Sequence, residues 1–279
     1  TFVDKMKEEA YENNILHPKF SQTNVVTGRL SCSDPNFQNI PRGDKLPIKR
    51  VIQSRFDNGE IIEMDFAQLE FRVAAFLSQD SQAMQDILEG VDVHQNTANV
   101  IGCNRQDAKA HTFKPLYGGM SGTDEEKKYY SYFRKRYKGI TSWQETTEDT
   151  AIATSFVTLP SGRQYYFEGI KRASWGGSNF YTQVRNYPVQ GFATGDIVPA
   201  ACIDIYKQMK GMRTRLINTV HDSIIIDAHP GEVDSVLKKL KKACDGITQS
   251  INQRYNINFN VPLDYEIKKG HNWLDLKRI

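Results

Sequence analysis

The chain has 279 residues, a formal net charge of +3 and 39% hydrophobic residues, which is typical of a globular protein with a substantial core. So small a charge gives no evidence for nucleic-acid binding by overall basicity. A nucleic-acid-binding surface would have to come from local clustering of Lys and Arg residues. The four cysteines form no CxxC pair, which argues against a zinc knuckle or a dense disulfide framework. No apolar run is long enough to cross a bilayer, so we expect a cytoplasmic protein without a membrane partner.

The first half of the chain predicts an irregular segment, a strand and then a long helical stretch. Residues 27–41 are polar and punctuated by proline and glycine, which indicates ligand-facing irregular backbone. A strand is expected over 60–65 and a helix over 68–77. Residues 92–154 have a helical pattern, with Asn104 as a plausible N-cap. Because strands are predicted on both sides, we expect the helical stretch to be an insertion into one αβ unit.

The second half predicts further strands and helices. Strand-like residues 157–166 surround a proline-glycine turn, and a helix is expected over about 195–210. A hairpin then joins strands at 215–220 and 223–227, with His221 and Asp222 at its tip. A charged amphipathic helix over about 232–254 and a strand over 261–267 complete the pattern.

One face of the helix predicted to start after Asn104 carries four side chains at intervals of four residues: Arg105, Lys109, Phe113 and Tyr117. Two cations suit the phosphates of a nucleoside triphosphate, and two flat rings suit its sugar and base. An ordinary packing helix would show the same spacing. However, Pro115 removes one helical hydrogen bond and is expected to kink the helix after Phe113, which favours a functional role.

Two aspartates, Asp65 and Asp222, are each expected at the end of a strand. Adjacent strands would place both carboxylates at one edge of a sheet. Hard divalent cations prefer oxygen ligands, and two-metal sites stabilise the attacking and leaving oxygens of a displacement at phosphorus. A pair of aspartates alone would equally fit solvated turns, but together with the cation and ring pattern it favours a nucleotidyl-transfer enzyme.

Several sequence blocks resemble those of family A DNA polymerases and occur in the family's order. Residues 65–72 resemble motif A, residues 105–118 resemble motif B and residues 220–222 resemble motif C. Residues 27–41 resemble the TGRLSSxxPNLQNIP block, and residues 186–191 resemble the NxPxQG block. Nearly the whole chain from about residue 15 is covered, so the sequence is similar to the palm and fingers of a DNA polymerase I-like enzyme, in a phage-like variant.

This resemblance implies an α+β fold, in which an antiparallel palm sheet with packed helices receives an inserted, mostly helical fingers subdomain. We expect the N-terminal part of the palm at residues 1–91, the fingers at 92–156 and the C-terminal part of the palm at 157–279. Some fingers residues are expected near 165–185. The thumb and the 3′–5′ exonuclease domain of typical relatives are expected to be absent from this chain.

The implied function is template-directed DNA synthesis by a DNA-directed DNA polymerase, which adds deoxynucleoside monophosphates to a primer 3′ end and releases pyrophosphate. The implied partners are primer-template DNA and dNTPs, together with a separate thumb, exonuclease domain or processivity partner. The implied cofactor is Mg²⁺, as two divalent ions, with Mn²⁺ as a substitute. A phage-encoded enzyme would act in the host cytoplasm.

The resemblance also implies roles for individual residues. The catalytic residues would be Asp65, Asp222 and Lys109, and the metal ligands would be Asp65, Asp222 and the backbone carbonyl of Phe66. The dNTP-binding residues would be Gln68, Glu70, His94, Arg105, Lys109, Phe113 and Tyr117. Among these, Glu70 matches the steric gate that disfavours a ribose 2′-hydroxyl. The DNA-binding residues would be Arg29, Asn36, Gln38, Gln190 and His221.

Two positions depart from the family pattern. Ser223 stands where motif C commonly has glutamate, and Lys114-Pro115 follows Phe113 where motif B usually has glycine. We expect polymerisation to survive the first change with altered metal affinity, and closure of the fingers to be altered by the second.

Other interpretations remain open at this point. One alternative is a single-subunit RNA polymerase, which Glu70 and the block at residues 27–41 oppose. The other is a catalytically weak fragment that binds primer-template and needs the missing thumb or other domains. The basic aromatic run at residues 129–137 suggests a platform for single-stranded nucleic acid, but a helix with buried rings and solvated cations is favoured. Asn36 could form only a local Asx turn.

Overall fold

The computed structural model of the chain describes residues 2–10, 14–40 and 47–279. Its contacts divide the chain into two compact units. The first, here called the sheet unit, comprises residues 1–67, 194–251 and 263–279. The second, here called the helical unit, comprises residues 68–193 and 252–262.

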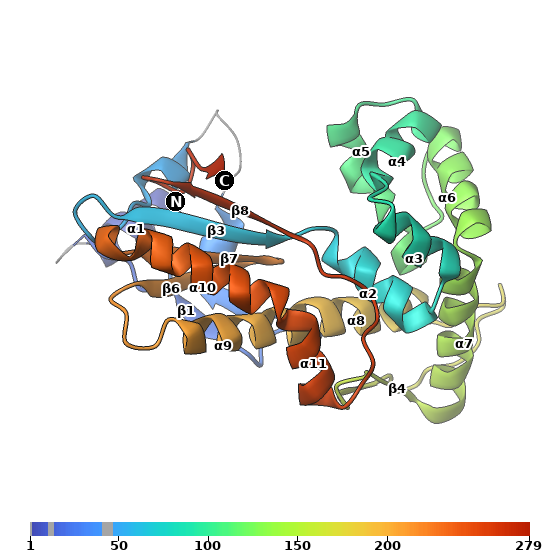
Figure 1. Ribbon diagram of the computed structural model, residues 1–279. Coiled ribbons are helices and arrows are strands. Elements are labelled where there is room, and N and C mark those ends of the chain that lie inside the picture. Colours follow the sequence, from blue (N-terminus) through green and yellow to red (C-terminus); the bar gives the residue numbers. More distant parts are fainter. Residues whose placement is uncertain (1, 11–13, 41–46) are drawn as a thin grey trace. The chain divides into compact units, whose positions relative to one another are not determined.

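The sheet unit is built on a five-stranded antiparallel sheet with the strand order β6-β7-β3-β8-β9 (Figure 1). Its strands are β3 (Glu60–Phe66), β6 (Arg215–Val220), β7 (Ser223–Ala228), β8 (Tyr265–Gly270) and β9 (Lys277–Arg278). A separate two-stranded sheet pairs β1 (Lys19–Ser21) with β2 (Ser31–Ser33). The helical segment of the chain thus interrupts a single sheet, as the flanking strands predicted.

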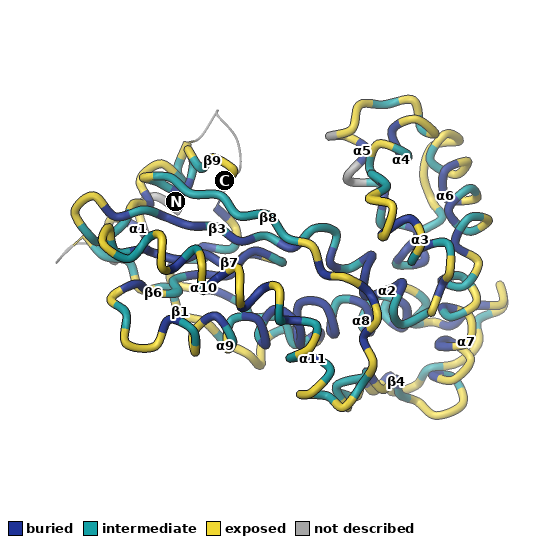
Figure 2. The backbone as a smooth tube through the Cα atoms, viewed as in Figure 1, coloured by how far each residue is buried: buried dark blue, intermediate teal, exposed yellow. Residues whose placement is uncertain are grey.

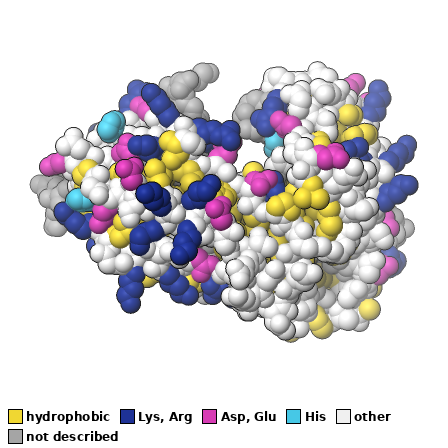
Figure 3. Space-filling model, in the orientation of Figure 1, with side chains coloured by type: hydrophobic (Ala, Val, Ile, Leu, Met, Phe, Trp, Pro, Cys, Tyr) yellow, Lys and Arg dark blue, Asp and Glu magenta, His cyan; other side chains and the backbone are white. Residues whose placement is uncertain are grey.

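Helices of the sheet unit lie against its central sheet. They are α1 (Phe2–Glu9), α9 (Val198–Gln208), α10 (Val233–Asp245) and the first turn of α11 (Ile247–Tyr255), with 3₁₀ turns η1 (Phe37–Asn39), η2 (Ile48–Val51) and η5 (Pro230–Glu232). Figure 1 shows α9 and α10 lying across one face of the sheet. Lys and Arg side chains gather over these two helices (Figure 3).

The alternation of side chains along β3 separates two buried layers. Ile61 belongs to one hydrophobic cluster, whose other members are Met6, Cys32, Phe37, Ile40, Ile52, Val220, Ile225 and Trp273. Ile62 and Met64 point to the opposite face and are 0% exposed. Figure 2 shows the resulting buried backbone of the central strands. Asp65 has the same parity as Ile61, so its side chain lies on the cluster's face of the sheet.

The helical unit contains most of the remaining elements. They are α2 (Leu69–Ser78), α3 (Ser81–Leu88), α4 (Val93–Ile101), α5 (Arg105–Thr112), η3 (Pro115–Tyr117), α6 (Asp124–Arg136), α7 (Lys138–Thr154), β4 (Phe156–Thr158), β5 (Gln164–Tyr166) and α8 (Tyr181–Gln190). A π-helical turn, Gly191–Ile197, follows α8. Local sequence determines several helix starts: Thr123 and Glu126 form a reciprocal capping box at α6, and the Asn104 side chain accepts from the Asp107 N–H at α5.

The predicted α+β fold, with an antiparallel sheet and a mostly helical insertion, is confirmed. The predicted helix over 232–254 is two helices that meet at Gly246, and the last strand begins at Tyr265 rather than at residue 261. Helices α1 and α8 were not predicted. Within the described ranges, no helix is long and apolar enough to cross a membrane.

The two units divide the chain at different places from the expected palm and fingers boundaries. Residues 68–91, expected in the palm, are grouped with the helical unit, as are residues 157–193, of which only some near 165–185 were expected in the fingers. The physical reason is packing within that unit. The Phe71 ring of α2 lies 5.2 Å from the Tyr137 ring, and Arg185 of α8 pairs with Glu148 of α7. These contacts are made by buried side chains whose partners cannot be identified from periodicity alone.

Candidate active-site residues

The structure brings Asp65 and Asp222 to one edge of the sheet. Strand β3 ends at Phe66, and Asp65 lies directly opposite Ser223, the first residue of β7. His221 and Asp222 form the two-residue turn between β6 and β7, and the Phe66 N–H donates to the Asp222 carbonyl across 3.3 Å. The strand-end pattern in the sequence therefore predicted this placement correctly.

Ser223 is held inside the hairpin. Its hydroxyl donates to the Val220 carbonyl at 2.9 Å, and the residue is 7% exposed. On the other side of Asp65, strand β8 places Glu266 directly opposite it, but that carboxylate pairs with Arg278 at 3.1 Å. Among the described residues, no group of three or more His, Cys, Asp and Glu side chains could hold a metal ion.

Three of the predicted DNA-binding residues converge on the same hairpin. Arg29 Nη2 lies 2.7 Å from His221 Nδ1, and His221 has a positive φ of 57°. Gln38 Nε2 donates to the Thr219 carbonyl at 3.0 Å. Asn36 accepts from the Gln38 N–H at 3.0 Å, so the expected Asx-type turn is present. These contacts orient the polar segment against the turn that carries Asp222.

The helix that was predicted to carry four side chains on one face is shorter than expected. Helix α5 ends at Thr112, Phe113 is its C-cap, and Tyr117 lies in the separate turn η3. The prediction of one continuous helical face was therefore wrong. Pro115 has no N–H to continue the ladder, and the carbonyl of His111 instead accepts from the Lys114 N–H at 3.2 Å.

Arg105 and Lys109 both lie on α5, where the sequence placed them. Arg105 Nε donates to Asp92 at 2.6 Å. Burial alone would raise the pKa of Asp92, but hydrogen bonds from Arg105 and from the Gln95 N–H hold it below its ordinary value. The Lys109 side chain lies outside the part of the chain that the structure describes. Spacing along the chain did not predict Asp92 as the partner of Arg105, although Asp92 stands two residues before His94.

The two aromatic residues have separate partners within the helical unit. The Phe113 ring lies 5.2 Å from the His94 ring, edge to face, and 6.4 Å from the Phe71 ring. His94 Nδ1 lies 3.0 Å from the Thr112 hydroxyl. The Tyr117 hydroxyl donates to the carboxylate of Glu70 on α2. Phe113 and Tyr117 are thus positioned by side-chain packing from α2 and α4.

The remaining two predicted residues lie at the ends of helices. Gln68 is the N-cap of α2 and adopts a left-handed conformation with a φ of 53°, without a capping bond from its side chain. This turn separates β3 from α2, so Glu70 falls in the first turn of the helix. Gln190 is the last residue of α8.

Lys114 points back into the helical unit. Its Nζ donates to the Ser121 carbonyl at 2.5 Å and lies 5.4 Å from the centre of the Tyr130 ring. The extra cation of motif B therefore ties η3 to the segment before α6. Sequence spacing had no signal for this contact, because a lysine at the end of a helix is usually solvated.

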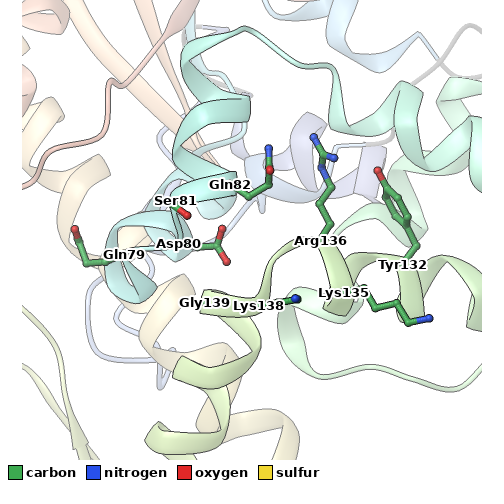
Figure 4. Close-up of a pocket in the computed structure, with 9 residues that line it drawn as sticks. All are labelled: Gln79, Asp80, Ser81, Gln82, Tyr132, Lys135, Arg136, Lys138 and Gly139. Carbon is green, nitrogen blue, oxygen red and sulfur yellow. The ribbon is translucent and has the colours of Figure 1, made fainter.

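The basic aromatic run at residues 129–137 is mainly a packing helix, as favoured. Its four buried rings belong to Tyr129, Tyr130, Phe133 and Tyr137, all less than 5% exposed. Three other residues of this run, Tyr132, Lys135 and Arg136, help to line the cavity shown in Figure 4. Its volume is about 600 Å³. None of the predicted site residues lines this cavity.

The cavity marks a junction of helix ends. Its residue Asp80 is 3% exposed, and its carboxylate accepts from the Ala83 N–H at the start of α3 and from the Ile140 N–H at the start of α7. One buried carboxylate thus satisfies donors of two helices. These hydrogen bonds give Asp80 a structural role.

Comparison with known proteins gives a consistent result. Residues 1–275 match the family described as DNA polymerase family A. The chain is 27% identical over 300 residues to the thermostable DNA polymerase I of Thermus aquaticus, covering 99% of this chain and 35% of that protein. It is 30% identical over 284 residues to DNA polymerase I of Deinococcus radiodurans, covering 94% of this chain and 28% of that protein. The chain thus spans about a third of the length of such relatives.

Among solved structures, the fold is similar to that of the polymerase domain of Pol1 from M. smegmatis in complex with DNA primer-template and dNTP. The TM-score is 0.80 at 23% sequence identity, over 98% of this chain and 51% of that chain. At this identity the comparison shows a shared fold.

Proposed function

Because the chain belongs to DNA polymerase family A, we propose that it carries out template-directed DNA synthesis, with the sheet unit as the palm and the helical unit as the fingers. It would add deoxynucleoside monophosphates to a primer 3′ end and release pyrophosphate. The partners would be primer-template DNA and dNTPs, which are present in the solved complex of similar fold. The observation that carries the proposal is the juxtaposition of Asp65 and Asp222 at the end of β3.

The residues at this edge suit Mg²⁺. Magnesium is commonly held by one or two carboxylates together with substrate phosphates and water, so a third protein carboxylate is not required. Asp65, Asp222 and the Phe66 carbonyl would be the protein ligands. When bound, two such ions would stabilise the attacking and leaving oxygens of the displacement at phosphorus. Asp65, near the end of β3, and Asp222, in the β6–β7 turn, would hold these ions at the primer end.

The helical unit would bind the triphosphate and the nascent base pair. Arg105 is held through its Nε by Asp92, which orients the guanidinium while its two terminal nitrogens supply donors for phosphate oxygens. Lys109, one turn further along α5, would protonate the departing pyrophosphate. Phe113 would stack on the incoming nucleotide. Because the His94 ring packs against the Phe113 ring, His94 would also position Phe113. This role would be in addition to the phosphate contact that the family resemblance implies.

Glu70 and Tyr117 would form the wall that meets the sugar. Their mutual hydrogen bond keeps the carboxylate of the steric gate in place. Gln68 would contribute to the same pocket from the turn before α2. A closed polar wall of this kind rejects a ribose 2′-hydroxyl because the added group would displace a bonded carboxylate.

The primer-template would be bound by Arg29, Asn36, Gln38, Gln190 and His221. Three of the five, Arg29, Gln38 and His221, lie in or contact the β6–β7 hairpin that carries Asp222, and Asn36 accepts from the Gln38 N–H. Contacts of side-chain amides and cations to sugar edges and phosphates depend little on base sequence, as copying requires.

Primer extension tests the proposal. The unmutated chain, with Mg²⁺ and four dNTPs, should extend a primer, whereas Asp222→Ala should not. Asp234→Ala, which removes an exposed carboxylate from α10, serves as the matched control and should extend normally. If the unmutated chain binds primer-template but fails to extend it at high enzyme concentration, the catalytically weak binding fragment is the correct function instead.

A further inference from the structure

Two helices of the sheet unit present a row of lysines that the proposed polymerase site does not use. This lysine face consists of Lys207 on α9, Lys210 in the turn just after α9, and Lys238, Lys241 and Lys242 on α10, all exposed. Among the described residues, none of the five has a carboxylate within ion-pair distance. With a net charge of only +3 on the whole chain, five such lysines on two helices and the turn that follows α9 are a strong local concentration.

The lysine face is continuous across the two helices. Lys239 of α10 donates to the Gln208 carbonyl at the end of α9 at 2.6 Å, which joins the helices. Both cover the same face of the sheet, so their outward sides turn the same way (Figures 1 and 3). The acidic residues of α10, Asp234 and Asp245, lie at its two ends and leave the lysines between them.

Exposed apolar side chains accompany the lysines on α9. Tyr206 is 68% exposed and Ile203 is 42% exposed, and they share one helical stripe with Lys207 at positions i, i+3 and i+4. The buried side of the same helix is formed by Val198, Ala201 and Ile205. A large aromatic ring that is not needed for packing is therefore displayed among cations.

This surface lies on the opposite side of the sheet from the Asp65 side chain. Asp65 has the parity of Ile61, whose cluster includes no residue of α9 or α10 among its described members, whereas Ile62 and Met64 are buried on the other face of β3. A strand bound at the lysine face would not need to meet the metal-ligand aspartates.

We propose that the lysine face binds single-stranded nucleic acid as a second site, separate from the polymerase site. Lysines spaced one helical turn apart would meet successive phosphates of one strand, and Tyr206 would stack on an unpaired base. The exposed ring favours a single strand, because the bases of a duplex are already stacked on one another. Recognition by charge and stacking is independent of base sequence.

The test is binding of a fluorescent oligothymidylate of about 20 nucleotides to the full chain, measured by anisotropy. Excess unlabelled hairpin primer-template occupies the polymerase site during the measurement. The face variant replaces all five lysines with glutamine: K207Q, K210Q, K238Q, K241Q and K242Q. The charge-matched control replaces five exposed lysines of the helical unit: K127Q, K128Q, K135Q, K138Q and K171Q.

The face variant should bind at least about tenfold more weakly near physiological salt, and its log-log salt slope should fall by up to about 3.5, since each lost phosphate contact contributes about 0.7. The charge-matched control should keep the slope of the unmutated chain. Tyr206→Ser should weaken binding about 5- to 100-fold, whereas Tyr166→Ser, at a ring that is 72% exposed, should not. Circular dichroism and thermal midpoints confirm that the variants are folded.

Equal binding by the face variant and the charge-matched control would overturn the proposal, as would no oligonucleotide binding once the hairpin is present. Primer extension distinguishes a failure of this second site from a failure of the proposed polymerase function. Extension by the face variant should be unchanged on the hairpin substrate. If no variant extends a primer but the lysine dependence of oligonucleotide binding persists, the polymerase assignment fails and the second site stands.

Discussion

Replacing Arg185 with methionine is expected to destabilise the helical unit by about 3–5 kcal/mol, because the change leaves a buried carboxylate without its counter-charge. Arg185 Nη2 lies 2.8 Å from Glu148 Oε2, and the two side chains are only 6% and 5% exposed. The same guanidinium lies 3.8 Å from the centre of the Tyr181 ring. The pair joins α7 to α8, the helix that ends in Gln190.

The double variant R185M/E148L separates the cost of a stranded charge from that of lost packing. Replacing a buried ion pair by apolar groups of similar size is often close to neutral, so the double variant should be more stable than R185M alone. The coupling between the two positions should exceed about 2 kcal/mol. The Arg172→Met change is the matched control, because its pair with Asp149 is 53% and 63% exposed and should be worth less than about 1 kcal/mol.

Urea denaturation followed by tryptophan fluorescence measures these differences. Trp175 is a suitable local probe, since its ring lies 5.1 Å from that of Tyr181. A cost for R185M no larger than that of the exposed-pair control would refute the reasoning. So would a double variant whose cost equals the sum of the two single changes.

Three further changes test other parts of the structure. Lys114→Met keeps the aliphatic stem but removes the donor to the Ser121 carbonyl, so amide hydrogen exchange at residues 116–121 should accelerate by an amount equivalent to about 1–2 kcal/mol. Unaltered exchange there would show that Lys114 does not hold η3 against this segment. Ser223→Glu places a third carboxylate opposite Asp65 and should lower the Mg²⁺ concentration for half-maximal extension severalfold, whereas Ser223→Ala should not; an unchanged metal titration would place Ser223 away from the metals. Burial would raise the pKa of Glu232, but hydrogen bonds from the start of β6 lower it to about 2. Because the folded pKa lies below the unfolded value of about 4.3, the stabilisation is full above that pH and is lost as pH falls towards 2. The stability advantage over Glu232→Gln, measured by denaturation across this range, should therefore shrink with acidification; a constant difference would contradict the assignment.

Local patterns in the sequence were sufficient for the elements that position the two aspartates. Alternation and turn residues predicted the strand that ends at Phe66 and the hairpin that carries Asp222, because a strand with one buried face and a two-residue turn leave few other registers. The N-cap at Asn104 could also be predicted from the sequence, because its side chain accepts a hydrogen bond from an N–H only three residues later.

Side-chain packing over long sequence separations could not be read in this way. Spacing alone extended α5 through Phe113 to Tyr117, whereas the structure ends the helix at Thr112 and holds the two rings by His94 and Glu70, which lie 19 and 47 residues earlier in the chain. The boundary between the two units was likewise decided by the packing of α2 and α8 against α7.

The sequence by itself thus determined the family, the strand-end aspartates and the chemistry that they favour, because motif residues and local periodicity act over short stretches of chain. Only the tertiary structure decided that Lys114 ties η3 to the start of α6, that Asp92 holds Arg105, and that α9 and α10 share one lysine face. Each of these depends on which distant backbone segments pack together, and burial of apolar surface sets that arrangement without leaving a periodic trace at the residues concerned.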